Sequence, residues 1–284
     1  MILTLDIPTT LVSPQDEAVF AAARESDVPE PAVESRLRPD GAEIKLRKGR
    51  HAGKAVWPDV ERDYWVYVPA VMAGPANLIV FQDGANYLER TNAATALDNL
   101  IAAGDLAPTV GLFVDPGDWA GQPKGSRANR SLEYDQLSDA YVRFLTEELF
   151  PEALHGLTIA DDPKKRAICG MSSGGICAFN AAWERPDLFG LVVSHVGSFT
   201  NIRGGHLYPS RVRQNGAKPI RVFLQGGAQD LDNTNGHWPT ANVDMAAALR
   251  FRGYDMRFEF GKGGHNFEHA AATLPATLRW IFRG

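Results

Sequence analysis

One serine stands in a pattern that can make it a nucleophile. Gly170-Met171-Ser172-Ser173-Gly174 has the form G-x-S-x-G, with the apolar residues Ala167-Ile168-Cys169 before it and several small residues after it. The glycines allow a strand and a helix to approach each other closely around a tight turn, and that turn projects the serine hydroxyl outward. We therefore predict a strand–turn–helix unit in which Ser172 can attack a carbonyl group.

A nucleophilic serine needs a base to take its proton and an acid to orient that base. In hydrolases with this turn, the acid and then the base follow the serine, each in a loop after a later strand. Asp230 follows the apolar run 220–224, and His265 follows the run 256–260 and two glycines. The sequence predicts Asp230 and His265 as the partners of Ser172, with Asp232 as the alternative acid.

The negative charge that develops on an attacked carbonyl oxygen requires fixed backbone N–H donors. One donor is expected from Ser173, directly after the nucleophile. The other is expected from the loop Gln82-Asp83-Gly84-Ala85 after an early strand, where Ala85 is preferred over Gly84. Asp83 precedes the nucleophile, so we expect it to brace this loop rather than to serve as the acid.

Aromatic and polar residues in the later loops are candidates to bind a substrate. They are Trp119, Arg130, Glu133, His206, Tyr208 and Trp238. Aromatic rings with a few polar groups suit a carbohydrate or aryl ester. Two alternatives stay open: the tryptophans could stack on their own loops, and Arg130 could pair with Glu133.

The run His265-Asn266-Phe267-Glu268-His269 spells H-x-x-E-H, a zinc-peptidase motif. A zinc peptidase that uses His265 and His269 is therefore an alternative. It is opposed by the glycines just before His265, which place that residue outside the helix, and by the absence of any further Asp, Glu, His or Cys downstream. We expect neither a metal nor an organic cofactor.

The sequence also predicts where the five other histidines lie in the fold. His51 and His155 are expected in polar surface segments, His195 in a buried strand, and His206 and His237 in loops near the pocket. Two cysteines, Cys169 and Cys177, lie in apolar surroundings and are expected to be free buried thiols.

The elements that must position these residues alternate between strand and helix. Residues 1–40 are expected to form an N-terminal arm with a helix over 14–24, capped by Ser13, and residues 41–284 a single catalytic domain. Strands are predicted at 43–47, 62–68, 77–81, 109–114, 166–169, 190–196, 220–224 and 256–260. Helices are predicted at 92–103, 136–150, 174–184, 240–251 and 268–282. This alternation predicts an α/β fold, a three-layer α/β/α sandwich with a mostly parallel central sheet, whose ligands bind at the carboxyl ends of the strands.

Net charge and hydropathy limit the classes of partner that this protein is expected to bind. The net charge of −5 argues against a nucleic-acid partner, and no apolar run approaches the roughly 20 residues that span a bilayer. The expected partner is a small-molecule ester, and a homo-oligomeric state is left open. The N-terminus has no signal-peptide pattern, so the sequence predicts a cytoplasmic protein unless a leader has been removed.

With these residues in place, the sequence resembles the esterase D-like group of α/β-hydrolases. That group includes enterochelin esterases, feruloyl and acetylxylan esterases of carbohydrate esterase family 1, S-formylglutathione hydrolases and mycolyltransferases. The resemblance covers roughly residues 62–283 and is closest to the enterochelin-esterase-like branch. It is carried by Val80-Phe81-Gln82-Asp83-Gly84, Asn129-Arg130-Ser131-Leu132-Glu133-Tyr134-Asp135, Cys169-Gly170-Met171-Ser172-Ser173-Gly174-Gly175, Ser194-His195-Val196-Gly197-Ser198, Gly227-Ala228-Gln229-Asp230 and Gly263-Gly264-His265.

The resemblance implies an α/β-hydrolase fold and hydrolysis of a carboxylic ester through an acyl-enzyme intermediate. The family's nucleophile, acid and base fall on Ser172, Asp230 and His265, and its oxyanion loop falls on Asp83-Gly84-Ala85. The substrate is expected to be a carbohydrate, aryl or siderophore-like ester. The alternative from another class is a non-catalytic binding protein of the same fold.

Overall fold

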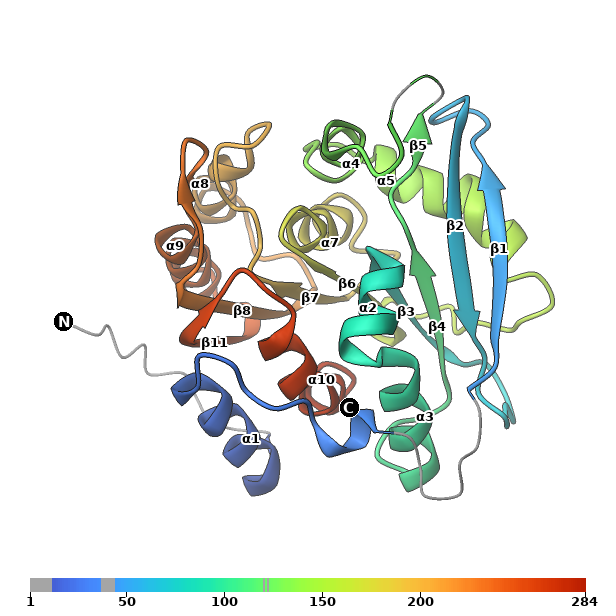
Figure 1. Cartoon of the computed structure of the whole chain (residues 1–284), viewed down its shortest axis with the longest axis horizontal. Helices are drawn as coiled ribbons and strands as arrows, with labels where there is room; N and C mark the ends of the chain where they lie inside the picture. The colour runs from blue at the N-terminus through green and yellow to red at the C-terminus, as the bar shows by residue number, and fades with distance from the viewer. Residues whose placement is uncertain (1–11, 37–43, 120, 122) are drawn as a thin grey trace.

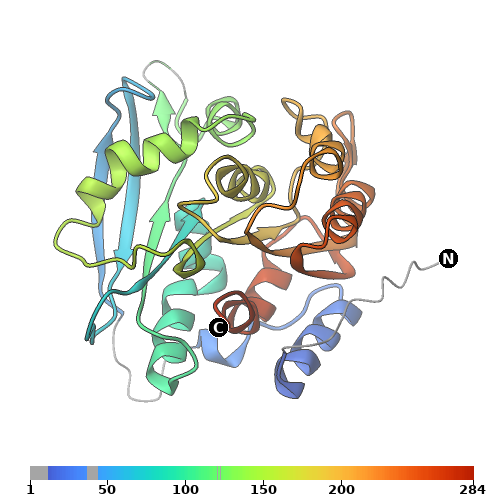
Figure 2. The same ribbon diagram turned by 180° about the vertical axis from the view of Figure 1, so that it is seen from behind.

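A mostly parallel β-sheet runs through the middle of the molecule, with helices on both of its faces (Figures 1 and 2). The computed structural model describes residues 12–36, 44–119, 121 and 123–284. Within that part of the chain the sheet has nine strands in the order β1-β2-β4-β3-β6-β7-β8-β11, and β5 pairs with β2. The strands are β1 (Leu46–Ala52), β2 (Val60–Tyr67), β3 (Asn77–Gln82), β4 (Thr109–Val114), β5 (Asp118–Trp119), β6 (Arg166–Met171), β7 (Leu191–His195), β8 (Arg221–Gln229) and β11 (Asp255–Gly264).

The helices divide into two layers with separate apolar cores. One layer holds α1 (Pro14–Glu25), α2 (Gly84–Thr91), α3 (Ala93–Ala103) and α10 (Glu268–Ile281). The other holds α4 (Arg127–Tyr134), α5 (Ala140–Arg143), a π-helical segment (Phe144–Leu149), α6 (Phe150–Ala153), α7 (Ser173–Glu184), α8 (Tyr208–Gln214) and α9 (Trp238–Phe251). The three-layer α/β/α sandwich is as predicted.

The burial pattern of each strand matches the way it pairs in the sheet. Every residue of β3, β4 and β7 is buried, as expected for parallel strands covered on both faces. In β2 the buried and less buried residues alternate, and this strand pairs antiparallel with β1 and β4. The remaining neighbours from β4 to β11 pair in parallel.

Several elements differ from the prediction. The first strand is β1, not 43–47, and His51 within it is fully buried rather than on the surface, with ring nitrogens 3.3 Å from Glu148 Oε2 and 2.9 Å from Glu152 Oε2. Helices α2, α4 and α8 were not predicted; each has only seven or eight residues, too few for a clear apolar period. The predicted boundary between arm and domain at residue 40 lies outside the described residues.

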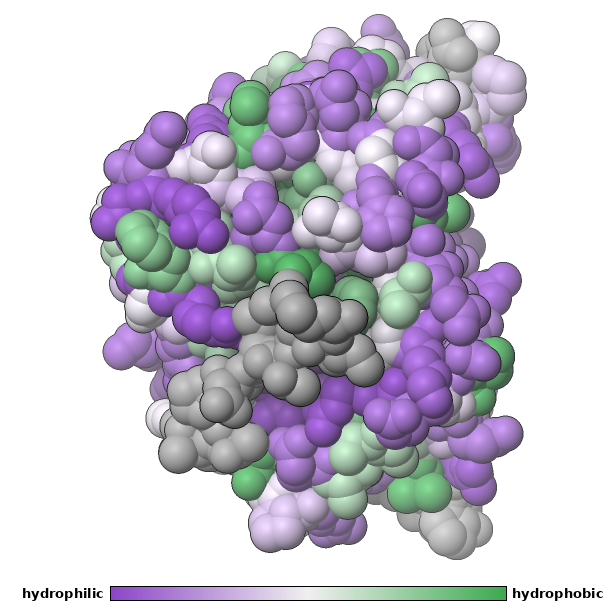
Figure 3. Space-filling view, turned by 90° about the vertical axis from the view of Figure 1, so that its left-hand side faces the viewer, coloured by the Kyte–Doolittle hydropathy of each residue, from purple (hydrophilic) through white to green (hydrophobic). Residues whose placement is uncertain are grey.

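Short elements complete the description: 3-10 turns at Val33–Ser35, Pro163–Lys165 and Gly205–Leu207, and a small separate hairpin of β9 (Asp232–Asn233) and β10 (Gly236–His237). Both cysteines are free and buried, as predicted. None of the helices in the described ranges is long and apolar enough to cross a membrane. Figure 3 shows that the side carrying α8 and α9 is mostly hydrophilic, with small separate apolar areas.

Helix α1 is part of the packed structure. Ser13 caps it through a 3.0 Å bond from the Asp16 N–H, and Pro14 is its first residue, as predicted. Phe20 is fully buried against Phe223 of β8, with ring centroids 5.8 Å apart. Ion pairs link α1 to β11 and α10: Arg24 with Glu259, Arg257 with Glu17, and Arg279 with Asp16.

Phe20→Ala is expected to lower the free energy of unfolding by about 3–5 kcal/mol, because it removes a buried ring between α1 and the sheet. Urea denaturation would measure this change. Phe251→Ala is the matched control, since Phe251 is 64% exposed at the end of α9 and its loss should cost less than about 0.5 kcal/mol. Equal midpoints for wild type and Phe20→Ala would show that α1 does not contribute to the core.

Candidate active site

A strained turn joins β6 to α7 and carries Ser172. The Ser172 backbone has φ 60° and ψ −120°, a conformation that L residues rarely adopt. A Cβ atom added to Gly170 would lie 2.2 Å from the carbonyl oxygen of Gly174, so the chain can pass this closely only if Gly170 has no side chain. The Ser172 N–H donates to the His195 carbonyl at 2.9 Å, which fixes the turn to the end of β7.

Three predicted residues come together at the carboxyl ends of β6, β8 and β11. Ser172 Oγ lies 2.8 Å from His265 Nε2, and His265 Nδ1 lies 2.6 Å from Asp230 Oδ1. The Asp230 carboxylate is buried and also accepts the Leu231 N–H at 2.7 Å, whereas the His265 ring is 18% exposed. Asp232, the alternative acid, is exposed on the small hairpin. The chain of contacts therefore runs from a partly accessible serine to a buried carboxylate.

Two further side chains contact this group. Ser198 Oγ lies 3.2 Å from Ser172 Oγ and accepts a hydrogen bond from Trp238 Nε1 at 3.3 Å. The Trp238 ring stands edge-on to the His265 ring, with centroids 5.9 Å apart. Trp238 is nearly fully buried and was predicted to bind substrate. Its side chain contacts Ser198 and His265. Sequence reasoning missed Ser198, although its segment was among those that carry the family resemblance.

The loop after β3 is fixed on three sides. Arg130 of α4 forms two 2.7 Å bonds to the Asp83 carboxylate and a 3.1 Å bond to the Met171 carbonyl. The Asp83 N–H donates to Tyr134 Oη at 3.2 Å, and the Ala85 N–H donates to Asp115 Oδ1 at 2.9 Å. Arg130 thus connects this loop directly to the turn at Ser172.

These contacts bear on which backbone N–H of this loop is available as an oxyanion donor, and they do not favour Ala85, the donor preferred from the sequence. Because the Ala85 N–H is taken by Asp115, Ala85 is poorly suited to be an oxyanion donor. Within the described part of the chain, no hydrogen-bond partner is found for the Gly84 N–H at the start of α2. A Cβ atom on Gly84 would lie 2.5 Å from the backbone of Phe113 and Val114, so only glycine fits at this position.

The pKa values of two groups around the site follow from burial. Burial raises the pKa of the Asp115 carboxyl to about 6, although the hydrogen bond from the Ala85 N–H opposes the shift. Burial also lowers the pKa of His195 to about 3, and its Nδ1 lies 2.7 Å from Tyr87 Oη. His195 is the core histidine that the sequence predicted.

The other predicted substrate-binding residues fall into two groups. The prediction that Glu133 and Tyr208 bind substrate is wrong, because both are buried with partners in the core. Glu133 bonds to Arg62 and to the Gly117 N–H, and Tyr208 bonds to Asn180. Pairing of Arg130 with Glu133 is likewise wrong, since their partners are Asp83 and Arg62. Trp119 is half-buried and His206 is exposed, so both retain surface that could meet a substrate.

His265 and His269 point to different partners. His269 Nε2 lies 3.0 Å from the carbonyl oxygens of Ala23 and Ser26 at the end of α1. His265 precedes α10 and faces Ser172 and Asp230. This divergence argues against the zinc-peptidase alternative, and among residues 12–36, 44–119, 121 and 123–284 no cluster of three His, Cys, Asp or Glu side chains could hold a metal ion.

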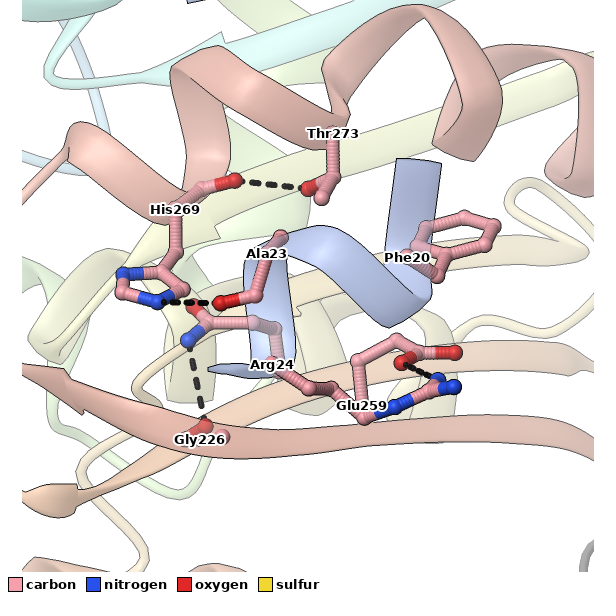
Figure 4. Close-up of a pocket in the computed structure, with 9 residues that line it drawn as sticks. Phe20, Ala23, Arg24, Gly226, Glu259, His269 and Thr273 are labelled. Carbon is pink, nitrogen blue, oxygen red and sulfur yellow. Dashed lines mark hydrogen bonds and ion pairs between the residues drawn. The ribbon is translucent and has the colours of Figure 1, made fainter. Parts of the chain in front are cut away.

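A small cavity of about 10 Å³ lies between α1, α10 and the middle of β8 and β11 (Figure 4). Phe20, Arg24, Glu259 and His269 line it, and Figure 4 shows the His269 ring turned toward Ala23. None of the three catalytic candidates lines this cavity, which has room for about one water molecule. It belongs to the packing of α1 and not to the site at Ser172.

Stability should fall as pH rises from about 4 to about 6 through Asp115. The folded protein holds a proton on this carboxyl up to about pH 6, whereas the unfolded chain releases it near the ordinary pKa of 3.8. The folded state thus binds more protons in this range, and the free energy of unfolding decreases as they are released. Asp115→Asn removes this contribution, so its stability relative to wild type should rise across the range, as measured by denaturant unfolding at several pH values. Parallel pH profiles would contradict the assignment.

Similar sequences include two curated esterases. The chain is 29% identical over 266 residues to the iron(III) enterobactin esterase of Dickeya dadantii (strain 3937), an alignment that covers 87% of this chain and 57% of that protein. It is 25% identical over 176 residues to the iron(III) enterobactin esterase of Escherichia coli O6:H1, covering 60% of this chain and 42% of the relative. The chain thus spans only about half the length of these relatives.

Solved structures show the same fold. The enterobactin esterase from Shigella flexneri, crystallised in the presence of enterobactin, matches with a TM-score of 0.71 at 19% identity, covering 89% of this chain and 61% of that one. A ferulic acid esterase from Anaeromyces mucronatus matches with a TM-score of 0.70 at 17% identity, covering 91% and 97%. These likenesses show an α/β-hydrolase fold.

The match to a protein family extends over most of the chain. The family described as "Putative esterase" matches residues 59–281, a range that holds the turn at Ser172, the loop after β3 and the loops of Asp230 and His265. The chain therefore belongs to this esterase family.

Proposed function

We propose that this protein is a serine esterase that hydrolyses a carboxylic ester through an acyl-enzyme intermediate. The observation that carries the proposal is the unbroken line of contacts from Ser172 Oγ to His265 Nε2 and from His265 Nδ1 to Asp230. The distance between Ser172 Oγ and His265 Nε2 lies within the range that proton transfer requires, and the distance between His265 Nδ1 and Asp230 is that of a hydrogen bond. Membership of an esterase family supports the same reaction.

In the first half of the reaction, Ser172 Oγ attacks the ester carbonyl carbon while its proton passes to His265 Nε2. The resulting imidazolium gives this proton to the departing alcohol as the ester C–O bond breaks, leaving the acyl group on Ser172. In the second half, His265 takes a proton from water and the water oxygen attacks the acyl carbon. The bond between the acyl carbon and Ser172 Oγ then breaks, the proton returns from His265 to Oγ, and the carboxylic acid leaves. Asp230 orients His265 and stabilises the imidazolium in both halves.

Two backbone amides are proposed to hold the oxyanion. One is the Ser173 N–H at the start of α7, directly after the nucleophile. The other is the Gly84 N–H, in place of Ala85, because the Ala85 N–H already donates to Asp115. The ties from Arg130 to Asp83 and to the Met171 carbonyl support this assignment, since they hold the two donor segments together.

The proposed substrate class is an ester that bears an aromatic group. The relatives and neighbours are named as enterobactin and ferulic acid esterases, and one Shigella flexneri structure was obtained with 2,3-dihydroxy-N-benzoyl-serine. Trp119 and His206 keep exposed surface that could contact such a group. Comparing turnover of acetyl, feruloyl, catecholate and lactone esters would separate these substrates.

Ser172→Ala should abolish the activity. Wild type is expected to hydrolyse p-nitrophenyl acetate and to be labelled covalently by a fluorophosphonate, and Ser172→Ala should lose labelling and at least about 10⁴-fold of kcat/KM. Ser210→Ala, at an exposed serine of α8, is the matched control and should behave as wild type. An unlabelled, inactive wild-type protein would instead favour a non-catalytic binding protein.

Substitution of the two candidate acids should have clearly different effects on kcat. Asp230→Asn is expected to lower kcat by about 10²–10⁴-fold, because the amide no longer holds His265 in the required tautomer or stabilises its charge. Asp232→Asn, two residues away and exposed, should leave kcat within about twofold of wild type. Steady-state kinetics on one ester measures both; a larger loss at Asp232 would reverse the assignment of the acid.

A further inference from the structure

Ser198 holds the nucleophile through both its main chain and its side chain. Its N–H donates to the Ser172 carbonyl at 3.0 Å, and its Oγ lies 3.2 Å from Ser172 Oγ. The residue is fully buried. A buried hydroxyl beside the proposed nucleophile must influence where the proton of Ser172 points.

The backbone that presents Ser198 is strained. Val196 has φ 42°, which is unfavourable for a β-branched residue, and its N–H donates to the Gln225 carbonyl at 2.7 Å. A Cβ atom on Gly197 would lie 2.5 Å from Ser194 Oγ and 2.6 Å from the Phe199 ring, so only glycine fits there. Such strain persists where the surrounding structure enforces it, and it is concentrated at functional sites.

The direction of the hydrogen bonds follows from Trp238. An indole N–H can only donate, so Ser198 Oγ must accept from Trp238 Nε1. The Ser198 proton is then left for Ser172 Oγ, the only other partner of this hydroxyl within the described chain. Ser172 in turn can direct its own proton to His265 Nε2, since His265 Nδ1 faces Asp230.

Asn242 keeps the donor and Ser198 together. Its Nδ2 donates to the Gly197 carbonyl at 2.9 Å and to the Trp238 carbonyl at 3.0 Å. Asn242 is fully buried in the second turn of α9. The start of α9 is therefore fastened to the segment that carries Ser198.

We propose that Ser198 is a positioning residue for the nucleophile. Its hydroxyl donates to Ser172 Oγ, so that the proton of Ser172 points to His265 and one lone pair remains free to attack the ester carbon. Trp238 enforces this direction. The inference rests on the proposed esterase function and extends it to residues that do not touch the substrate.

The same hydrogen bond acts when the acyl-enzyme breaks down. As the bond between the acyl carbon and Ser172 Oγ breaks, its electron pair stays on Oγ and the proton returns from His265. The Ser198 hydroxyl then donates to an oxygen that is gaining negative charge, and such hydrogen bonds are stronger than neutral ones. Both halves of the reaction should therefore slow when this hydroxyl is removed.

Ser198→Ala, Trp238→Phe and the double variant test the proposal on the full-length protein. Ser198→Ala should lower kcat for p-nitrophenyl acetate, and the rate of fluorophosphonate labelling, about tenfold while KM stays within about twofold. Trp238→Phe, which keeps a ring beside His265 but removes the N–H, should lower kcat about threefold. In the Ser198→Ala background the tryptophan substitution should have no further effect, because its N–H acts only through Ser198.

Ser194→Ala is the matched control: it removes a buried hydroxyl from β7 for which no hydrogen-bond partner is found in the described part of the chain. It should leave kcat unchanged, and thermal unfolding should show all variants folded. Additive losses, or an unchanged kcat in Ser198→Ala, would overturn the proposal, and if that variant does not fold, an unchanged kcat in Trp238→Phe would do so. Failure of the esterase function is distinct, since wild type itself would then be inactive or Ser172→Ala would remain active.

Discussion

The close passage of β6 and α7 around Ser172 is the constraint on which the rest of the site depends. A side chain at Gly170 would collide with the Gly174 carbonyl, so Gly170 must lack one before the backbone of Ser172 can take its strained conformation. Strain of this kind persists only if neighbouring segments hold it. The end of β7 and the segment after it do so through His195 and Ser198, which bond to the N–H and the carbonyl of Ser172. The parallel sheet then aligns the ends of β8 and β11 beside this turn.

Local patterns were sufficient to identify the residues that face one another at the site. Ser172, Asp230 and His265 each follow a short apolar strand, and parallel strands bring their carboxyl ends to one edge. The sheet and most helices were predictable for the same reason, since buried strands and long amphipathic helices leave clear periodic patterns. Their ends were less so: β8 and β11 extend to Gln229 and Gly264, beyond the apolar runs that revealed them.

Features that depend on contacts between distant residues were not predictable. Glu133 and Arg62 are 71 positions apart, and nothing local indicates that they pair in the core. The proposal of Gly84 over Ala85 as oxyanion donor depends on Asp115, which follows another strand and accepts the Ala85 N–H. Buried His51 and the hydroxyl of Ser198 are of the same kind: the residue type is visible in the sequence, but its partner is set by the fold.

The position of α1 has a consequence for how the chain is made. This first described helix packs against β11 and α10, the last two described elements, and the bond between Arg24 and Glu259 joins residues 235 positions apart. During synthesis the helix emerges from the ribosome long before β11 and α10 are made. The Phe20 side chain therefore remains unburied in an incompletely folded chain until then. Closing such a long loop costs chain entropy before the contacts form, and this slows folding. Docking of α1 onto β11 and α10 is thus expected to be a late event in folding, and it coincides with synthesis of the strand that precedes His265, the proposed base.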